Sequence, residues 1–78
     1  MSDIHKVRFL SRRGLKELDI LLSRYVNNYY DQADDDEKEA YRELLLKEDQ
    51  DILDFILVEK QLENPLLKQL QLKLRAGA

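Results

Sequence analysis

The sequence predicts an all-α protein, folded as a compact bundle of about five short helices. Residues that favour helices (Leu, Lys, Glu, Arg and Gln) dominate the 78 residues, whereas β-branched residues are few and never alternate over the length of a strand. A chain of this length forms one domain, residues 1–78, and its short helices are stable only when they pack against one another. We therefore expect cooperative unfolding.

Two amphipathic helices are expected at the start of the chain, with a junction at Gly14. From Asp3 to Arg12, apolar residues spaced by three predict a short helix (Ile4, Val7, Leu10). From Leu15 to Tyr30, steps of three and four form the stripe of a core-facing helix (Leu15, Leu18, Leu22, Tyr25, Val26, Tyr29). Glycine commonly lies just past the end of one helix or at the start of the next.

A third helix is predicted over Asp35–Lys47. Asp34 followed by Glu37 resembles a capping box, and the acidic residues around it favour the positive end of a helix. The apolar residues of this segment fall on one face (Ala40, Tyr41, Leu44, Leu45).

Two more helices follow. Asp49 can cap a fourth helix, whose apolar residues point nearly all round and therefore need enclosure (Ile52, Leu53, Phe55, Ile56, Leu57). Asn64 followed by Pro65 is a cap with proline at the first helical position. We expect this fifth helix to face the core through four leucines and to end at Gly77 (Leu66, Leu67, Leu70, Leu74).

The composition argues against an enzyme. Without cysteine there is no thiol nucleophile and no thiolate metal site, and Gly14 and Gly77 are too far apart for a phosphate-binding loop. His5 lies close to a chain end, a poor place to hold a base, and residues 34–37 lack the spacing of a calcium loop. We expect no catalytic residue, no metal ligand and no cofactor held by this chain itself.

The sequence also predicts a cytoplasmic protein that does not insert into a membrane. It contains no uncharged apolar run of about 18 residues, as a membrane-spanning helix requires. The first six residues lack the apolar segment of a signal peptide.

Charge is unevenly distributed along the chain. Residues 1–24 contain six basic and three acidic residues, residues 25–63 four basic and thirteen acidic, and the remainder three basic and none acidic. A basic first third could serve a small helical adaptor or a nucleic-acid or transcription-associated protein. Glu17, Asp19 and the acidic middle would repel phosphates, so we expect no nucleic-acid partner.

The segment Arg12–Asp19 gathers both signs of charge around Gly14. If Gly14 is the N-cap, Glu17 is the third helical residue, and its carboxylate can reach back to a free backbone N–H. Arg13 and Glu17 would then project near one another on the outside of the turn, where a residue without Cβ lets a partner's backbone approach. Two interpretations stay open: an ordinary turn with a glutamate cap, or a rigid recognition site in which arginine grips a carboxylate.

This segment, Arg13-Gly14-Leu15-Lys16-Glu17-Leu18-Asp19, resembles the signature of the small succinate dehydrogenase assembly factor family, the bacterial relatives of the mitochondrial flavinylation factor. The signature reads Arg-Gly-x-x-Glu, commonly extended by Leu-Asp. The order of other features is also similar over about residues 4–74: a double arginine, a helix ending in tyrosines, an Asp-Asp-Glu-Lys helix start and a pair of leucines. Phe55 departs from the family, which usually carries tryptophan there and a glycine soon after.

The resemblance implies a function that composition does not. Family members bind the flavoprotein subunit of succinate dehydrogenase, and in many bacteria that of fumarate reductase, and promote covalent attachment of FAD to a histidine of that subunit. Carried over to this chain, the partner-binding residues are Arg13, Gly14 and Glu17 with their neighbours Arg12 and Asp19, whereas Leu18 is expected in the core. FAD would then be attached to the partner, and the free chain is expected to be a monomer.

Overall fold

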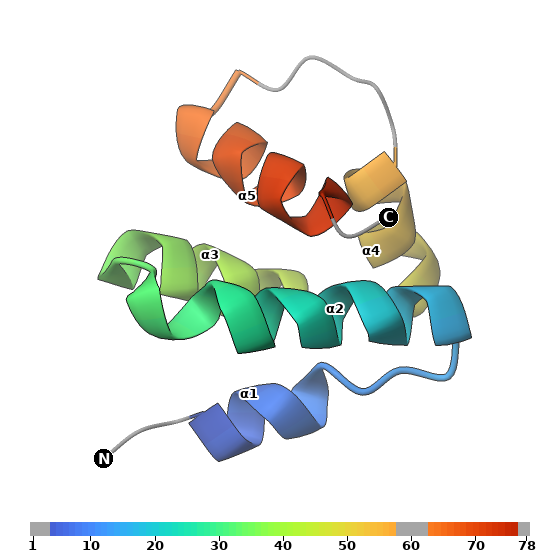
Figure 1. Cartoon of the computed structure of the whole chain (residues 1–78). Coiled ribbons are helices and arrows are strands. Elements are labelled where there is room, and N and C mark those ends of the chain that lie inside the picture. The colour runs from blue at the N-terminus through green and yellow to red at the C-terminus, as the bar shows by residue number, and fades with distance from the viewer. Residues whose placement is uncertain (1–3, 58–62, 77–78) are drawn as a thin grey trace.

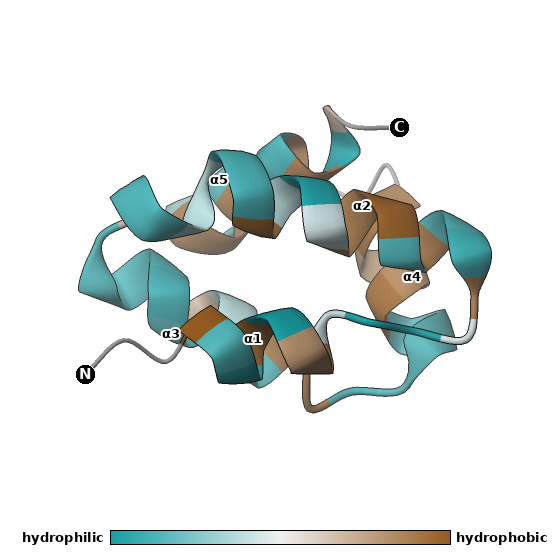
Figure 2. Ribbon diagram, turned by 60° about the horizontal axis from the view of Figure 1, so that its bottom comes forward, coloured by the Kyte–Doolittle hydropathy of each residue, from teal (hydrophilic) through white to brown (hydrophobic). Residues whose placement is uncertain are grey.

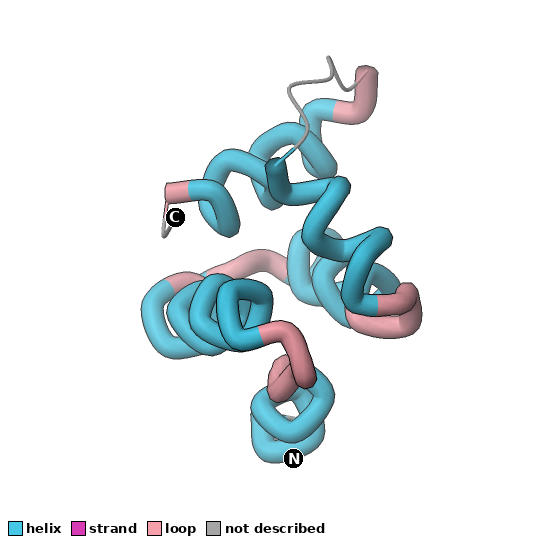
Figure 3. Tube along the Cα trace, turned by 90° about the vertical axis from the view of Figure 1, so that its right-hand side faces the viewer, coloured by secondary structure: helices cyan, strands magenta, loops and turns pink. Residues whose placement is uncertain are grey.

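The computed structural model describes residues 4–57 and 63–76, which form helices and loops without any strand (Figure 3). The α-helices are α1 (Ile4–Leu10), α2 (Lys16–Asn28), α3 (Asp35–Leu44), α4 (Asp49–Leu57) and α5 (Pro65–Arg75), and a 3-10 helix, η1 (Tyr30–Gln32), follows α2. The predicted all-α class is confirmed.

The helices α2 and α3 form the middle of the bundle, with α1 on one side and α5 on the other (Figure 1). α1 lies along α2, and α5 lies across the other side of α2 and α3 and also contacts α4. The radius of gyration is 11.5 Å, which matches the roughly 11.5 Å expected of a compact chain of this length. Each helix therefore buries one face against its neighbours, as such short helices require.

The core is formed by one face of each helix. Val7 and Leu18 are buried, as the periodicity predicts, and so are most other members of the predicted stripes (Leu22, Tyr25, Val26, Tyr41, Leu44, Leu45, Ile52, Ile56, Leu70, Leu74). Leu15 departs from the predicted stripe because it is 40% exposed, and Leu21 is buried although the stripe omitted it. Phe55 is half-buried and packs against this core.

Three helices end earlier than predicted because local hydrogen bonds turn the chain. Ser11 closes α1 by donating its hydroxyl to the Val7 carbonyl (2.7 Å). α2 gives way to η1 at Tyr29, and α3 ends at Leu44. Beyond Leu44 the N–H groups of Leu46 and Lys47 donate to carbonyls three residues back, which tightens the last turn.

Two of the predicted helix caps are confirmed and one is wrong. Asp34 caps α3 by accepting the Glu37 N–H (2.8 Å), and Asn64 caps α5 by accepting the Leu66 N–H (2.9 Å). Asp49 is not a cap, because it is already the first residue of α4. Gly77 lies outside the described residues, so its predicted role stays a prediction.

A buried carboxylate ties three helices together. Glu37 on α3 accepts the Tyr25 hydroxyl of α2 (2.6 Å) and the Lys73 ammonium of α5 (2.8 Å). Burial, and then this hydrogen bond to Glu37, raises the pKa of Tyr25 well above the ordinary tyrosine value. Glu37 therefore stabilises the core from inside rather than closing the capping box that the sequence suggested.

Candidate partner-binding site

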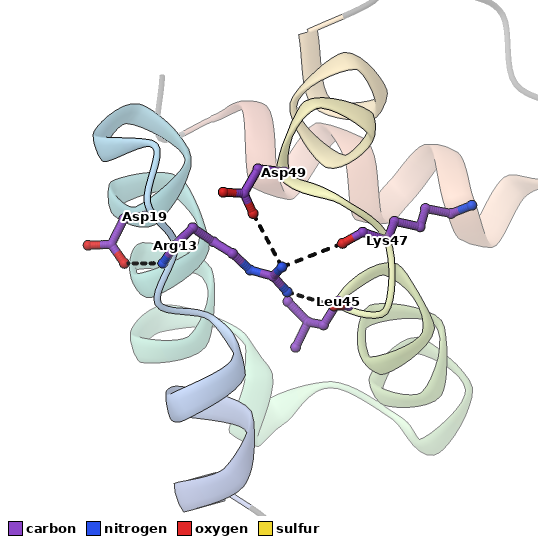
Figure 4. Close-up of polar contacts among 5 residues, drawn as sticks. All are labelled: Arg13, Asp19, Leu45, Lys47 and Asp49. Atoms are coloured by element: carbon purple, nitrogen blue, oxygen red, sulfur yellow. Dashed lines mark hydrogen bonds and ion pairs between the residues drawn. The ribbon is translucent and has the colours of Figure 1, made fainter.

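The connection between α1 and α2 is fixed to the rest of the protein by Arg13. Its guanidinium extends toward the link between α3 and α4 (Figure 4), where it donates to the Leu45 carbonyl (2.6 Å) and, at longer range, to the Lys47 carbonyl (3.5 Å). It also pairs with the Asp49 carboxylate (3.3 Å). Arg13 thus joins the end of α3 to the start of α4.

This geometry corrects the prediction that Arg13 projects on the outside of the turn. Its side chain is only 14% exposed, and its buried Nε has no hydrogen-bond partner among the residues that the structure describes. The carboxylate that it reaches belongs to Asp49 of its own chain, with a single close contact rather than a bidentate one. Arg13 therefore stabilises the turn through contacts with the rest of the chain rather than through exposure to solvent.

The condition that Gly14 is the N-cap of the second helix, on which the expected position of Glu17 depended, is not met. The N-cap is Leu15, in an extended conformation (φ −78°, ψ 117°), so Glu17 is the second helical residue rather than the third. The carboxylate that reaches back is that of Asp19, which accepts the Arg13 backbone N–H (3.0 Å). Asp19 takes this position because it lies one helical turn beyond Leu15, on the side of α2 that faces the incoming chain (Figure 4).

Gly14 is not required by the fold of this chain. It has no positive φ, and a Cβ added to it would meet only the Asp49 carboxylate, at 3.9 Å, an ordinary contact distance. The interpretation in which this glycine serves only the geometry of the turn therefore loses its physical basis. Its missing side chain leaves an exposed stretch of backbone on the surface.

Glu17 has the opposite environment to Arg13. Its side chain is exposed and makes no hydrogen bond or ion pair within the described part of the chain. Arg12 and Lys16 are exposed as well. The segment Arg12–Asp19 therefore divides in two. Arg13, Leu18 and Asp19 hold the turn, whereas Arg12, Gly14 and Glu17 present an accessible backbone and both signs of charge. Such a surface can bind a polypeptide.

Sequence reasoning missed two participants. Asp49 is paired with Arg13 across 36 positions of the chain, and no local pattern signals such a contact. Leu15 was assigned to the core stripe but stands at the surface beside Glu17. The sequence did contain a signal for this position, because leucine is disfavoured at the N-cap of a helix.

Two further findings bear on what this surface can do. None of the described helices has the length and hydropathy needed to cross a bilayer. Among the described residues, no three acidic or histidine side chains come together in a way that could hold a metal ion.

Comparison with known proteins identifies the family. The family model described as "Flavinator of succinate dehydrogenase" matches residues 5–78. The FAD assembly factor SdhE of Acinetobacter baylyi is 43% identical over 70 residues, which are 90% of this chain and 82% of that protein. The FAD assembly factor SdhE of Methylococcus capsulatus is 37% identical over 76 residues, 97% of this chain and 92% of the relative. No solved structure matches significantly. The chain therefore belongs to the family of succinate dehydrogenase flavinators, as its resemblance to that family's signature predicted.

Proposed function

We propose that this protein is an assembly factor that binds the flavoprotein subunit of succinate dehydrogenase and promotes its covalent flavinylation with FAD. The observation that carries the proposal is the match to the flavinator family over residues 5–78. The names of the relatives, FAD assembly factors, agree with it. The exposed turn at Gly14 and Glu17 is the surface through which we expect the flavoprotein subunit to be bound.

The mechanism that suits this surface is conformational. A protein that binds one arrangement of a multidomain partner raises the population of that arrangement, without itself taking part in the bond-forming step. The flavoprotein subunit that is bound in this way is called the client below. The reactive flavin atom and the histidine that it joins both belong to the client with its FAD, so the cofactor and the client supply the chemistry of bond formation. This chain would supply a turn held in one shape by Arg13 and Asp19, with Glu17 ready to accept hydrogen bonds from the client.

Several narrower expectations belong to the same proposal. The client range includes succinate dehydrogenase and extends to fumarate reductase in organisms that make both. The free protein is a cytoplasmic monomer, not an enzyme in its own right, and has no nucleic-acid partner. A gel shift with short duplexes that weakens with salt would instead favour the alternative adaptor function of the basic first third.

The test is flavinylation of the client. The flavoprotein subunit is expressed in a bacterial host without its own assembly factors, with and without this chain, and covalent flavin is measured by fluorescence in a denaturing gel. We expect much stronger fluorescence when the chain is present. Equal fluorescence in the two lanes, at equal amounts of flavoprotein, would end the proposal.

A further inference from the structure

Beside Glu17 the surface forms an open apolar hollow of about 290 Å³. Leu15, Lys16 and Glu17 line it from the start of α2, and Leu53 lines it from α4. α2 and α4 contact one another here, and Figure 2 shows hydrophobic segments of both helices at this side of the molecule. The hollow is therefore continuous with the exposed half of the signature.

Leu15 departs from the usual chemistry of a helix N-cap. At an N-cap, side chains with an oxygen acceptor satisfy the free N–H groups of the first turn, and leucine cannot. The α2 N-cap accordingly has no side-chain hydrogen bond, and yet Leu15 is 40% exposed rather than buried. Positions that violate local preferences without structural compensation are where functional sites are expected.

The surroundings of the hollow are apolar, and its rim carries one charge of each sign, from Lys16 and Glu17. Ile20, 53% exposed, lies three residues after Glu17 and four after Lys16, so it extends the same face of α2. Asp49 of α4 is paired with Arg13, whereas Glu17 makes no ion pair within the described residues.

We propose that the hollow between Leu15 and Leu53 receives an apolar side chain of the client flavoprotein, next to a lysine or arginine of the client that faces Glu17. This inference rests on the proposed function and adds α4 to the binding surface. In this proposal Arg13 has a second role, because its contacts with Leu45 and Asp49 also hold the start of α4 close to the turn. Arg13 is thus a positioning residue for both walls of the hollow.

The apolar half of the proposal is tested with Leu15→Ser and Ile20→Ser. Serine at position 15 supplies the missing cap, which offsets the apolar surface lost with the leucine, so the melting temperature should stay within about 5 °C of the parent. Leu72→Ser is the matched control, because Leu72 lies on α5 with 51% exposure, close to the exposure of Ile20. We expect at least a tenfold loss of affinity for the purified client with each of the first two variants, slower flavinylation, and no change with the control.

The charged half is tested with Glu17→Gln against Glu39→Gln. Both glutamates are exposed and lie on helices, α2 and α3 respectively, so each change removes one negative charge. We expect the Glu17 variant alone to weaken client binding at low salt, by severalfold, and to reduce its dependence on salt.

The outcomes separate this inference from the function beneath it. If the parent chain flavinylates the client and the Leu15 and Ile20 variants do so equally well, the hollow is not a docking site although the function stands. An equal loss with Leu72→Ser would also overturn the inference, since any exposed apolar residue would then matter. If the parent chain is inactive, both the function and the docking site are refuted.

Discussion

At the scale of single residues, the signature combines two roles that a linear pattern does not distinguish. Arg13 and Asp19 are bonded within the chain, while Glu17 makes no such contact in the described part of the structure. Gly14 has neither the backbone conformation nor the crowding that would make glycine necessary for folding. Stability and partner binding should therefore respond to different residues of the same short segment.

The first prediction concerns Gly14. Gly14→Ala should leave the free energy of unfolding unchanged or raise it by about 0.4–1 kcal/mol, because alanine restricts the unfolded chain and its Cβ meets only an ordinary contact. Gly14→Arg should keep the helical circular dichroism signal but abolish flavinylation, because a long side chain would block a partner's backbone. Urea titration and in-gel flavin fluorescence measure the two effects. A Gly14→Arg protein that is simply unfolded would show that the glycine is structural.

The second prediction separates Arg13 from Glu17. Arg13→Ala should lower the free energy of unfolding by about 1–3 kcal/mol, because it leaves the Leu45 carbonyl and the Asp49 carboxylate without their partner. Glu17→Ala should change that free energy by less than about 0.5 kcal/mol, since the side chain is exposed, yet weaken client binding. Arg13→Lys is the control that keeps the charge without the planar fork, and it should fall between the two in stability. Equal stability of the Ala variants would contradict this division.

At the scale of elements, short helices depend on their ends and on the contacts that place them. α5 begins with Asn64 as cap and Pro65 as first residue, and then packs against α2, α3 and α4. Its Gln71 and Arg75 donate to the carbonyls of Phe55 (2.7 Å) and Ile56 (3.0 Å) near the end of α4. α5 thus supplies side-chain donors to backbone carbonyls near the end of α4.

The third prediction is made for the start of α5. Asn64→Ala should lower the free energy of unfolding by about 1 kcal/mol, because the Leu66 N–H loses its acceptor. Asn64→Asp keeps an acceptor at the same place and should retain most of the stability. Thermal melts of the three proteins compare them directly, and an alanine variant as stable as the parent would show that the cap contributes nothing.

At the scale of the whole molecule, buried tyrosines hold the helices together. The rings of Tyr25 and Tyr41 lie 4.5 Å apart between their centroids, and Tyr30 packs against Tyr41 at 5.8 Å. The Tyr41 hydroxyl shares a 2.7 Å hydrogen bond with Ser11, so the end of α1 is tied to α3. Burial is the main cause that raises the pKa of both Tyr25 and Tyr41 above the ordinary value of 10.

The fourth prediction follows from these raised pKa values. Below pH 10 both tyrosines are protonated in the folded and the unfolded state. The stability that comes from burying their neutral hydroxyls is therefore fully present there. Above pH 10 the unfolded chain loses these protons while the folded protein keeps them, so stability falls by up to about 1.4 kcal/mol per pH unit for each tyrosine. Urea titrations at pH 9, 10 and 11 measure the slope.

A Tyr41→Phe variant is the control for this pH dependence. It removes one of the two tyrosines with a raised pKa, so its stability should fall less steeply above pH 10 than that of the parent. A parent protein whose stability is level between pH 9 and 11 would contradict the assignment.

The sequence by itself determined the helices, the buried stripes of α2 and α3, and the caps at Asp34 and Asn64. These features depend on neighbours three or four residues apart, which periodicity and capping chemistry describe directly. The resemblance to the flavinator signature also came from local sequence order, and the family match confirmed it. Helix ends were less accurate, because they depend on single hydrogen bonds such as that of Ser11.

Only the tertiary structure decided how the signature is used. Arg13 turns inward because the carbonyls of Leu45 and Lys47 and the carboxylate of Asp49, all more than 30 residues away in the chain, come together beside it. Leu15 lies outside the core stripe because it is the N-cap rather than the first residue of α2. The residues before it are held against the first turn of the helix by the hydrogen bond from the Arg13 N–H to Asp19. Contacts between distant segments have no local pattern, so the direction in which a charged side chain points becomes known only once the helices are packed.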